Sequence, residues 1–444
     1  MKKILWTLAS VGCLVLIFAG LFWVNQLGAK EKPTETNADF WIISDNHLLA
    51  RSLHDDGKAF QQIAATTAGK DIVYNEEILE ALVQKALIEK PDVLILTGDV
   101  TLNGELISLQ ALNRIFAPLK EAEIPVLAIP GNHDIFDGWA RSFIGDKQQV
   151  IEQISTDDFE KYLPDGFDLS ISRDSSSLSY TVDFGTYRLF MMDSNLYTIE
   201  KSHMAPITAG RFKDENISWL DQQLQACQND GQQPIVFMHH NLLQHNERIH
   251  DGYVLNNAAE VIPLMKKYQV PLVFSGHIHV QDIMEDSKNG FYEITSSSFS
   301  IAKTQVGHLH LSPNKISYQA ESFDPTSYLS TAEKNQTDLQ NYPNYIQQLF
   351  MEDGKRMAYQ NLFGQDIYED EIVDPIADFV GQANLRYFTG NNNLSAQEIA
   401  AIKAEPGYAL LEKYDQSLLK YVESTLVDPN TPDNLHLEID LTDK

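Results

Sequence analysis

Five short polar clusters follow apolar segments that have the length and composition of buried strands, and this arrangement constrains the fold more than any other feature. The clusters are Asp45-Asn46-His47, Gly98-Asp99, Gly131-Asn132-His133-Asp134, His239-His240 and Gly276-His277-Ile278-His279. Each cluster alone is typical of a turn, a helix cap or a solvated histidine. In open α/β sheets, however, ligands bind beyond the carboxyl ends of the strands. We therefore expect the five clusters to form one site.

The segments around these clusters alternate between strand and helix patterns. Predicted buried strands, rich in Ile, Val and Leu, are Phe40–Ser44, Val93–Thr97, Val126–Ile129, Tyr187–Met192, Ile235–Met238 and Leu272–Ser275. Predicted helices between them are Asn75–Glu89, Ser108–Ala122, Ser218–Gln228 and Ala258–Tyr268. This alternation predicts an α/β fold. Three later strands are joined by short turns, which predicts antiparallel pairing, and they are Phe291–Thr295, His308–Ser312 and Ile316–Ala320.

The pattern becomes helical after Phe323. Amphipathic helices are predicted at Pro343–Asn361, Asp374–Tyr387, Ala396–Ala404 and Leu410–Leu426. No cluster typical of a metal site occurs in this part of the sequence. We expect a C-terminal helical domain over residues 323–444 that packs on the first domain. A lid that shapes the substrate site is the alternative, because pockets favour domain interfaces.

The residue types in the five clusters indicate the chemistry of the site. They contain carboxylates, amides and imidazoles but no cysteine, which disfavours iron–sulfur chemistry and suits Mn, Fe or Zn. Together these groups are too many for one ion with open positions. They suit two ions that share a bridging ligand.

In this order the clusters resemble the motifs of the calcineurin-like metallophosphoesterases, D-x-H, GD, GNH-[DE], H and GH-x-H. The resemblance spans roughly Phe40 to Ser300, and within the family the chain looks most like bacterial class III cyclic-nucleotide phosphodiesterases in a membrane-anchored form. The resemblance implies a four-layer α/β/β/α sandwich over residues 39–322.

The resemblance also implies two metal ions with distinct ligands. One ion would be held by Asp45, His47 and His279. Asp99 would bridge this ion and the second one. The other would be held by Asn132, His239 and His277. Mn and Fe are favoured, and Leu102 stands where purple acid phosphatases carry a Tyr ligand, which disfavours that type.

Two further roles follow from the same resemblance. His133 would lie beside the scissile phosphate, oriented by Asp134, and protonate the leaving oxygen. Of the adjacent histidines we prefer His239 to His240 as a ligand, because it directly follows its strand. Other loop residues are either substrate contacts or ordinary surface residues, and these are His54, Asn103, His245, His250 and Tyr253.

The implied reaction is hydrolysis of cyclic nucleotides or similar small phosphodiesters, by in-line attack of a hydroxide that bridges the two metals. A phosphomonoesterase or nucleotidase using the same site is the main alternative. A non-catalytic binding scaffold is less favoured, because every expected ligand type is present. A protein phosphatase is disfavoured by the acidity of the chain.

Composition limits the partners. The chain has 33 Lys and Arg against 62 Asp and Glu, a formal charge of −29, which argues against a nucleic-acid polymer as partner. No protein partner is evident. With 2 cysteines, Cys13 in an apolar run and Cys227 without an obvious partner, a disulfide framework is excluded.

The amino terminus suggests a membrane location. Met1-Lys2-Lys3 precedes an apolar run from Ile4 to Val24, about the ~20 residues that a helix needs to cross a bilayer. We therefore predict an anchor at residues 1–24, a linker at 25–38 and a catalytic body outside the cytoplasm, by the positive-inside rule. Signal cleavage followed by secretion is the alternative.

Overall fold

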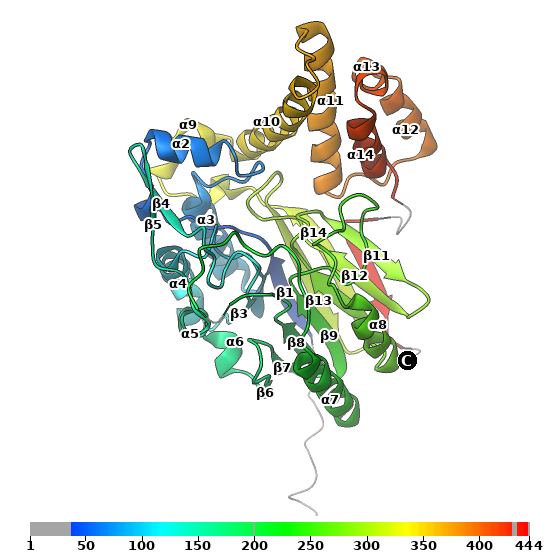
Figure 1. Cartoon of the computed structure of the whole chain (residues 1–444). Coiled ribbons are helices and arrows are strands. Elements are labelled where there is room, and N and C mark those ends of the chain that lie inside the picture. The colour runs from blue at the N-terminus through cyan, green and yellow to red at the C-terminus, as the bar shows by residue number, and fades with distance from the viewer. Residues whose placement is uncertain (1–36, 199, 429–432, 443–444) are drawn as a thin grey trace, which may run out of the picture. The chain divides into compact units, whose positions relative to one another are not determined.

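The parallel strands that carry the polar clusters belong to two β-sheets (Figure 1). The computed structural model describes residues 37–198, 200–428 and 433–442. The strands of the first sheet are β1 (Ala38–Ile43), β2 (Val93–Thr97), β3 (Val126–Ile129), β13 (Gln305–Ser312), β14 (Lys315–Ser322) and β15 (His436–Asp440). Their order is β15-β14-β13-β1-β2-β3, with β1, β2 and β3 parallel and the other neighbours antiparallel.

The second sheet has the order β11-β12-β10-β9-β8-β7-β6, and β8, β9, β10 and β12 are parallel. Its strands are β6 (Ser172–Arg173), β7 (Tyr180–Phe184), β8 (Tyr187–Met192), β9 (Gln233–Met238), β10 (Leu272–Ser275), β11 (Asp282–Asp286) and β12 (Phe291–Thr295). A separate hairpin consists of β4 (Arg141–Ile144) and β5 (Lys147–Val150).

Alternate residues of the second sheet face two different cores, as the period-2 geometry of strands requires. Leu189 and Phe237 belong to the cluster that they share with the first sheet, whereas Phe190 and Val236 pack with α7 (Asp214–Asp230) and α8 (Ala258–Lys267). This alternation explains why the strands are apolar throughout.

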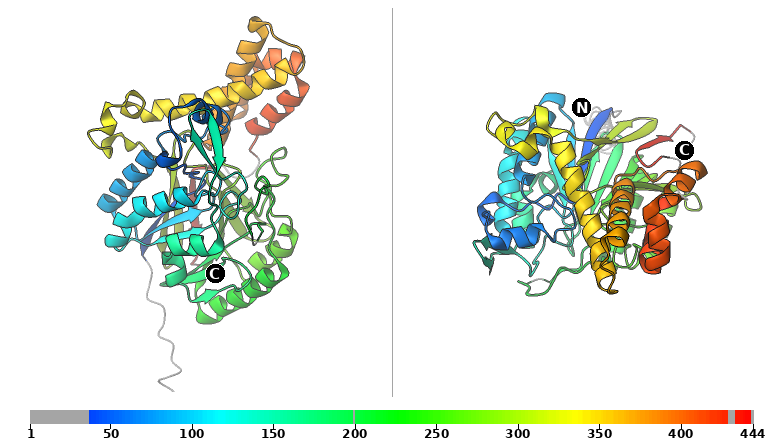
Figure 2. Two further views of the ribbon diagram at one scale, coloured as in Figure 1. Left: turned by 60° about the vertical axis from the view of Figure 1, so that its left-hand side comes forward. Right: turned by 90° about the horizontal axis from the view of Figure 1, so that it is seen from above.

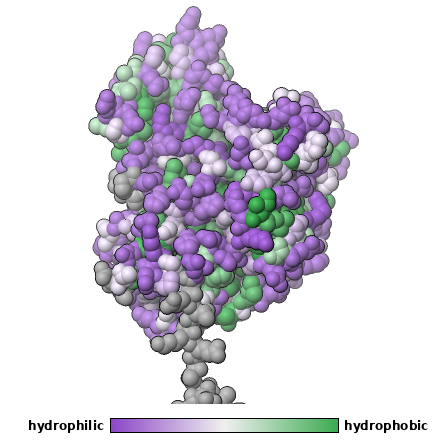
Figure 3. All heavy atoms as spheres, turned by 180° about the vertical axis from the view of Figure 1, so that it is seen from behind, coloured by the Kyte–Doolittle hydropathy of each residue, from purple (hydrophilic) through white to green (hydrophobic). Residues whose placement is uncertain are grey.

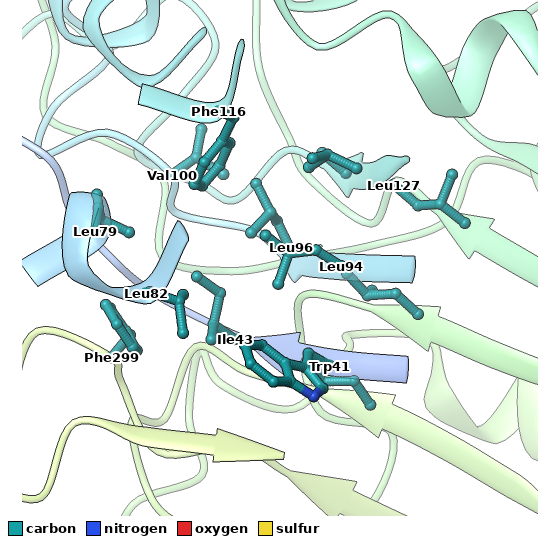
Figure 4. Packing of buried hydrophobic residues seen from close by; sticks show 14 of the residues in the cluster. Trp41, Ile43, Leu79, Leu82, Leu94, Leu96, Val100, Phe116, Leu127 and Phe299 are labelled. Carbon is teal, nitrogen blue, oxygen red and sulfur yellow. The ribbon is translucent and has the colours of Figure 1, made fainter. Parts of the chain in front are cut away.

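Two helices, α3 (Asn75–Glu89) and α4 (Leu106–Glu121), cover the first sheet. Figure 4 shows Leu79 and Leu82 of α3 facing Trp41, Ile43 and Leu96 of β1 and β2. Helices outside two stacked sheets form the predicted four-layer α/β/β/α arrangement, which is therefore confirmed. Shorter helical segments in this part are η1 (Arg51–Leu53), α2 (Lys58–Ala64), α5 (Thr156–Tyr162) and α6 (Asp165–Asp168).

The C-terminal helices lie beyond the carboxyl ends of the parallel strands (Figures 1 and 2). They are α9 (Thr337–Gln340), α10 (Tyr342–Phe363), α11 (Asp370–Phe388), α12 (Ala396–Lys403), α13 (Pro406–Tyr414) and α14 (Gln416–Leu426), after η2 (Pro325–Ser327) and η3 (Glu333–Asn335). Helix α10 packs on α11, which also contacts α13 and α14.

Two details of the C-terminal region differ from the prediction. The predicted helix Leu410–Leu426 is two helices, because the Asp415 side chain accepts the N–H groups of Ser417 and Leu418 at 3.0 and 2.9 Å and caps a new helix start. The chain then returns to the first sheet as β15, which pairs with β14.

The predicted location in the cell membrane requires correction. Within residues 37–198, 200–428 and 433–442, no helix is both long enough and apolar enough to cross a membrane. The segment on which the prediction rested, residues 1–24, lies outside the described residues, and so does Cys13. The membrane anchor and the extracytoplasmic location are therefore withdrawn. Cys227 is buried and free.

One face of the molecule is shown in Figure 3, where hydrophilic side chains predominate and hydrophobic ones are scattered among them. This appearance agrees with the acidic composition. Burial of apolar side chains is concentrated between the sheets and under the helices.

Candidate metal centre

The first group of predicted ligands converges at the carboxyl ends of β1, β2 and β10. The Nε2 atoms of His47 and His279 lie 3.1 Å apart, and His279 Nε2 lies 3.3 Å from Asp45 Oδ1. Asp45, His47, Asp99 and His279 each offer one ligand atom within 4.8 Å of the others. Two imidazole nitrogens and two carboxylates facing one point form a donor set that fits a transition metal ion.

The second group lies next to the first. Asp99, His239 and His277 also offer ligand atoms within 4.8 Å of one another. The side-chain oxygen of Asn132, which follows β3, lies 3.2 Å from His239 Nε2. The structure thus brings all seven predicted ligands together at one edge of the two sheets.

Asp99 stands between the two groups. Its Oδ1 atom accepts the backbone N–H of His133 at 2.8 Å. Its Oδ2 atom lies 3.7 Å from His47 Nε2 and 3.5 Å from His239 Nε2. One carboxylate oxygen therefore faces both groups, as a bridging ligand must.

Backbone carbonyls fix which histidine nitrogen is free to bind a metal. His239 Nδ1 lies 2.9 Å from the carbonyl oxygen of Thr97, and His277 Nε2 lies 2.9 Å from that of Thr208. Because a carbonyl can only accept, these nitrogens carry the proton. The other nitrogen of each ring is then left as a lone-pair donor, which is the usual arrangement around metal-binding histidines.

The charge state of the site also suits metal binding. Burial lowers the pKa of His277 to about 3, so its ring is neutral. Burial opposes ionisation of Asp99, but the imidazoles of His239, His133 and His47 hold the pKa of Asp99 well below its usual range. Burial also lowers the pKa of His239, but Asp99 outweighs this and raises it to about 9. Metal binding at His239 Nε2 would therefore displace a proton.

Five of the seven predicted ligands have backbone conformations that residues with side chains rarely adopt. Their φ angles are positive, namely Asp45 at 53°, His47 at 44°, Asp99 at 48°, His277 at 68° and His279 at 61°. The sharp turns aim side chains from adjacent loops at one point. Strain of this kind is typical of functional sites.

The glycines of two motifs provide the space that the ligands need. At Gly98, which has a φ of 99°, a Cβ atom would lie 2.3 Å from His239 Nδ1. At Gly131 a Cβ atom would lie 2.1 Å from the backbone nitrogen of Asp99. Any larger residue at these positions would displace a predicted ligand.

The predicted orientation of His133 by Asp134 is wrong. His133 Nδ1 lies 3.1 Å from Asn103 Oδ1 and 3.5 Å from Asp137 Oδ2. The buried Asp134 carboxylate instead accepts the N–H groups of Thr101 at 2.9 Å and Gly131 at 2.8 Å, besides others in the same loops. Asp134 ties the loop after β2 to the loop after β3, and the His133 ring faces Asn103 and, at a longer distance, Asp137 instead.

The remaining loop candidates divide between structural and cavity positions. His240 is held between Ser194 Oγ at 2.8 Å and the Thr208 carbonyl at 3.0 Å, outside both ligand groups. His54 stacks on Phe60 with ring centroids 3.8 Å apart.

The loop after β9 contributes one cavity residue. His245 is buried with its Nδ1 2.6 Å from Asp282, and His250 lies 3.0 Å from Asp251. Tyr253 lines the cavity and packs on His277, with ring centroids 4.9 Å apart. Of these three candidates, Tyr253 alone is placed to contact a substrate.

A cavity of about 370 Å³ lies over the ligand groups. Asp99, His133 and His277 line one part of it. Side chains that the sequence analysis missed line the rest, including Lys70 before α3 and Asn384 and Tyr421 of the C-terminal helices. No motif marks these residues, because only the tertiary packing brings them to the site.

Comparison with known families decides where the chain belongs. Residues 38–281, more than half of the chain, match the family described as calcineurin-like phosphoesterase. The chain belongs to the calcineurin-like phosphoesterases. Residues 324–432 match a second family, described as the C-terminal domain of cyclic nucleotide phosphodiesterase.

Curated relatives of this phosphoesterase are about a quarter identical to it over the aligned residues. A probable cyclic nucleotide phosphodiesterase of Fibrobacter succinogenes is 25% identical over 58% of this chain and 79% of its own length. A 3′,5′-cyclic adenosine monophosphate phosphodiesterase of Pseudomonas aeruginosa is 26% identical over 53% of this chain and 68% of its own. A probable glycerophosphodiester phosphodiesterase of Arcobacter nitrofigilis is 26% identical over 43% of this chain and 57% of its own length.

The family and the ligand groups together confirm the predicted class of enzyme, a metal-dependent phosphodiesterase. They also support two metal ions in this phosphoesterase. The donor set of carboxylates, amide and imidazoles fits such ions.

Proposed function

We propose that this phosphoesterase hydrolyses the phosphodiester bond of cyclic nucleotides at a two-metal centre. One ion is assigned to Asp45, His47 and His279, with Asp99 as the bridge. The other is assigned to Asn132, His239 and His277. The observation that carries the proposal is the single Asp99 oxygen that faces both groups at the base of the cavity. The activities named for the relatives support a cyclic-nucleotide substrate.

When bound, two metal ions would lower the pKa of a water and neutralise phosphate oxygens. The protein residues supply the remaining tasks. Asn103 Oδ1 accepts a hydrogen bond from His133 Nδ1–H, which leaves Nε2 as the ring nitrogen that can give a proton to the leaving oxygen. Lys70 adds a positive charge to the cavity wall, where it can attract the anionic substrate. For the metal pair we propose Mn or Fe, because imidazole and carboxylate donors suit both.

Turnover of the full-length chain with added Mn²⁺ tests the proposal. The substrates are 3′,5′-cyclic AMP, 2′,3′-cyclic AMP, bis-(p-nitrophenyl) phosphate and p-nitrophenyl phosphate. We expect the diesters to be preferred and a chelator to abolish turnover reversibly. Preference for the monoester would instead identify a phosphomonoesterase that uses the same ligands.

The matched variants are Asp99→Asn and Asp251→Asn. Asp99→Asn removes the charged bridge and is expected to lose bound metal and at least 100-fold in kcat, as for loss of a main electrostatic contact. Asp251 is 99% exposed, so its variant should behave as wild type. Full activity of Asp99→Asn would contradict the two-metal centre.

A further inference from the structure

We infer that the C-terminal helices form a nucleobase subsite in the cavity above the metal ligands, and that Asn384 reads the edge of an adenine. This inference rests on the proposed function, because it names the part of the cyclic nucleotide that the same cavity takes. The observations concern the helical wall of the cavity, which the metal chemistry does not use.

The cavity has two chemically different walls. The metal ligands and Lys70 form a wall that suits a phosphate. Helices α10 and α11 contribute an aromatic wall, in which the rings of Phe350 and Phe388 lie 5.3 Å apart and Met357 completes the apolar surface. A small base-free diester has no flat surface to bury against these rings. A nucleoside cyclic phosphate presents an anionic part and an aromatic part, which match the two walls.

Asn384 is the amide in this aromatic wall. It is 7% exposed, and its Oδ1 atom accepts the hydroxyl of Tyr421 at 2.9 Å. Its Nδ2 atom donates to no group in the ranges that the structure describes. Nδ2 is not one of the fully buried side-chain atoms without a partner in the described residues, so it is open to the cavity, where a ligand can accept from its N–H groups.

Gly354 of α10 keeps the space around this amide open. A Cβ atom at Gly354 would lie 3.1 Å from Asn384 Nδ2 and 3.0 Å from the Cα atom of Gly381 on α11. Glycine in a helix interior is less stabilising than alanine. Here the missing side chain lets α10 approach α11 and leaves the donor of Asn384 accessible from the cavity.

The chemistry of the free groups favours adenine. The Nδ2 N–H groups can donate to a ring nitrogen, and Oδ1 keeps a second lone pair beside the one that Tyr421 uses. An amide that offers a donor and an acceptor side by side pairs with the ring nitrogen and amino group of adenine. Tyr421 fixes the amide orientation and is therefore a positioning residue.

The first test compares kcat/KM of the full-length, Mn²⁺-loaded protein for 3′,5′-cyclic AMP and bis-(p-nitrophenyl) phosphate. Asn384→Leu should lose about 10- to 100-fold for cyclic AMP, mainly through KM, and stay within about twofold for the nitrophenyl diester. Tyr421→Phe should lose about threefold to tenfold for cyclic AMP through KM alone, since the amide remains. The control is Asn361→Leu, on the exposed side of α10, which should match wild type.

Two results would overturn the subsite. One is an unchanged kcat/KM for cyclic AMP in Asn384→Leu. The other is an equal loss on both substrates in Asn384→Leu and in Tyr421→Phe, since that pattern would show a general structural effect. A melting temperature for each variant shows whether the protein is folded.

The second test uses adenosine, which has no phosphate, as an inhibitor of nitrophenyl-diester hydrolysis. We expect adenosine to compete in wild type and at least tenfold more weakly in Asn384→Leu. If cyclic nucleotides are not cleaved but adenosine competes through Asn384, the proposed function fails and the subsite stands. If cyclic AMP is cleaved and adenosine does not compete, the subsite is overturned and the proposed function stands.

Discussion

At the scale of single residues, Lys70 is the most consequential addition to the predicted site. It lines the cavity together with Asp99 and Asp353. Burial lowers the pKa of Lys70, and the carboxylates of Asp99 and Asp45 oppose this. Lys70 therefore belongs to the wall of the cavity in which we propose that the substrate phosphate binds.

Replacing Lys70 tests this charge. We expect Lys70→Met to lower kcat/KM for every anionic diester about tenfold, because one attractive charge in the desolvated wall is lost. The control is Lys58→Met, at an exposed position of α2. The measurement is kcat/KM of both variants at two salt concentrations. If Lys70→Met matches wild type at both, Lys70 does not contribute to phosphate binding.

A second residue-scale prediction concerns the partner of His133. In Asn103→Leu the nearer acceptor at His133 Nδ1 is lost, and only Asp137 Oδ2 at 3.5 Å stays beside it. We expect kcat for cyclic AMP, which has an alkoxide leaving group, to fall about 100-fold. The fall for bis-(p-nitrophenyl) phosphate should be much smaller, because nitrophenolate needs no proton. The ratio of the two kcat values is the measurement.

Asp134→Asn is the informative contrast. Asp134 accepts backbone N–H groups from two loops and does not touch the His133 ring. We expect this variant to lower the free energy of unfolding by about 1–3 kcal/mol and both kcat values by the same factor. A selective loss for cyclic AMP would return Asp134 to the role first predicted for it.

At the scale of elements, the start of α14 (Gln416–Leu426) depends on one capping side chain. Asp415 caps α14, which carries Tyr421 into the cavity wall. We expect Asp415→Ala to lower the free energy of unfolding by about 1 kcal/mol, since two N–H groups lose their acceptor. Urea denaturation measures the change, and Gln397→Ala, exposed in α12, is the control. Equal stabilities would show that α14 does not need this cap.

The sequence patterns predicted the first and last residues of the strands more accurately than those of the helices. Strands β2, β3, β8, β10 and β12 have the predicted bounds because each is a short apolar run that ends at a turn. Helix α7 begins at Asp214 instead of Ser218, because Asn216 accepts the N–H of Lys213 at 3.1 Å and extends the first turn. Strand β15 is recognisable only through its pairing with β14, which is distant in the sequence.

The same reasoning separates the parts of the site. The ligands follow apolar strands in fixed short motifs, so their convergence could be predicted from local sequence. The partner of His133 could not, because Asp134 is its neighbour in sequence while Asn103 is its neighbour in space. Asn384 and Lys70 were missed for the same reason.

At the scale of the whole molecule, buried carboxyl groups couple stability to pH. Glu105 is fully buried at the start of α4, where Asn103 N–H and the Ser108 hydroxyl donate to it and Asp137 adds a repelling charge. Burial raises the pKa of Glu105 from 4.5 to about 8. The folded protein therefore holds a proton there that the unfolded chain releases.

The stability contributed by this proton is present below pH 4.5 and is lost as pH rises to about 8. We expect Glu105→Gln, which stays neutral, to gain stability relative to wild type as pH rises from about 5 to about 8, and the difference to level off above that. Urea midpoints at each pH measure the difference, with exposed Glu121→Gln as the control. A constant difference across this range would show that Glu105 does not titrate there.

The pairing of β14 with β15 has a modular consequence. The chain leaves the first sheet at Ser322 and rejoins it beside the same strand, where the N–H of Ala320 donates to the carbonyl of Leu435 at 2.8 Å. In topological terms the C-terminal helices are an oversized hairpin loop, and closing such a loop becomes only slowly more costly with length. Because this loop starts and ends beside one strand, its length and helices can change without altering the loops that carry the predicted metal ligands.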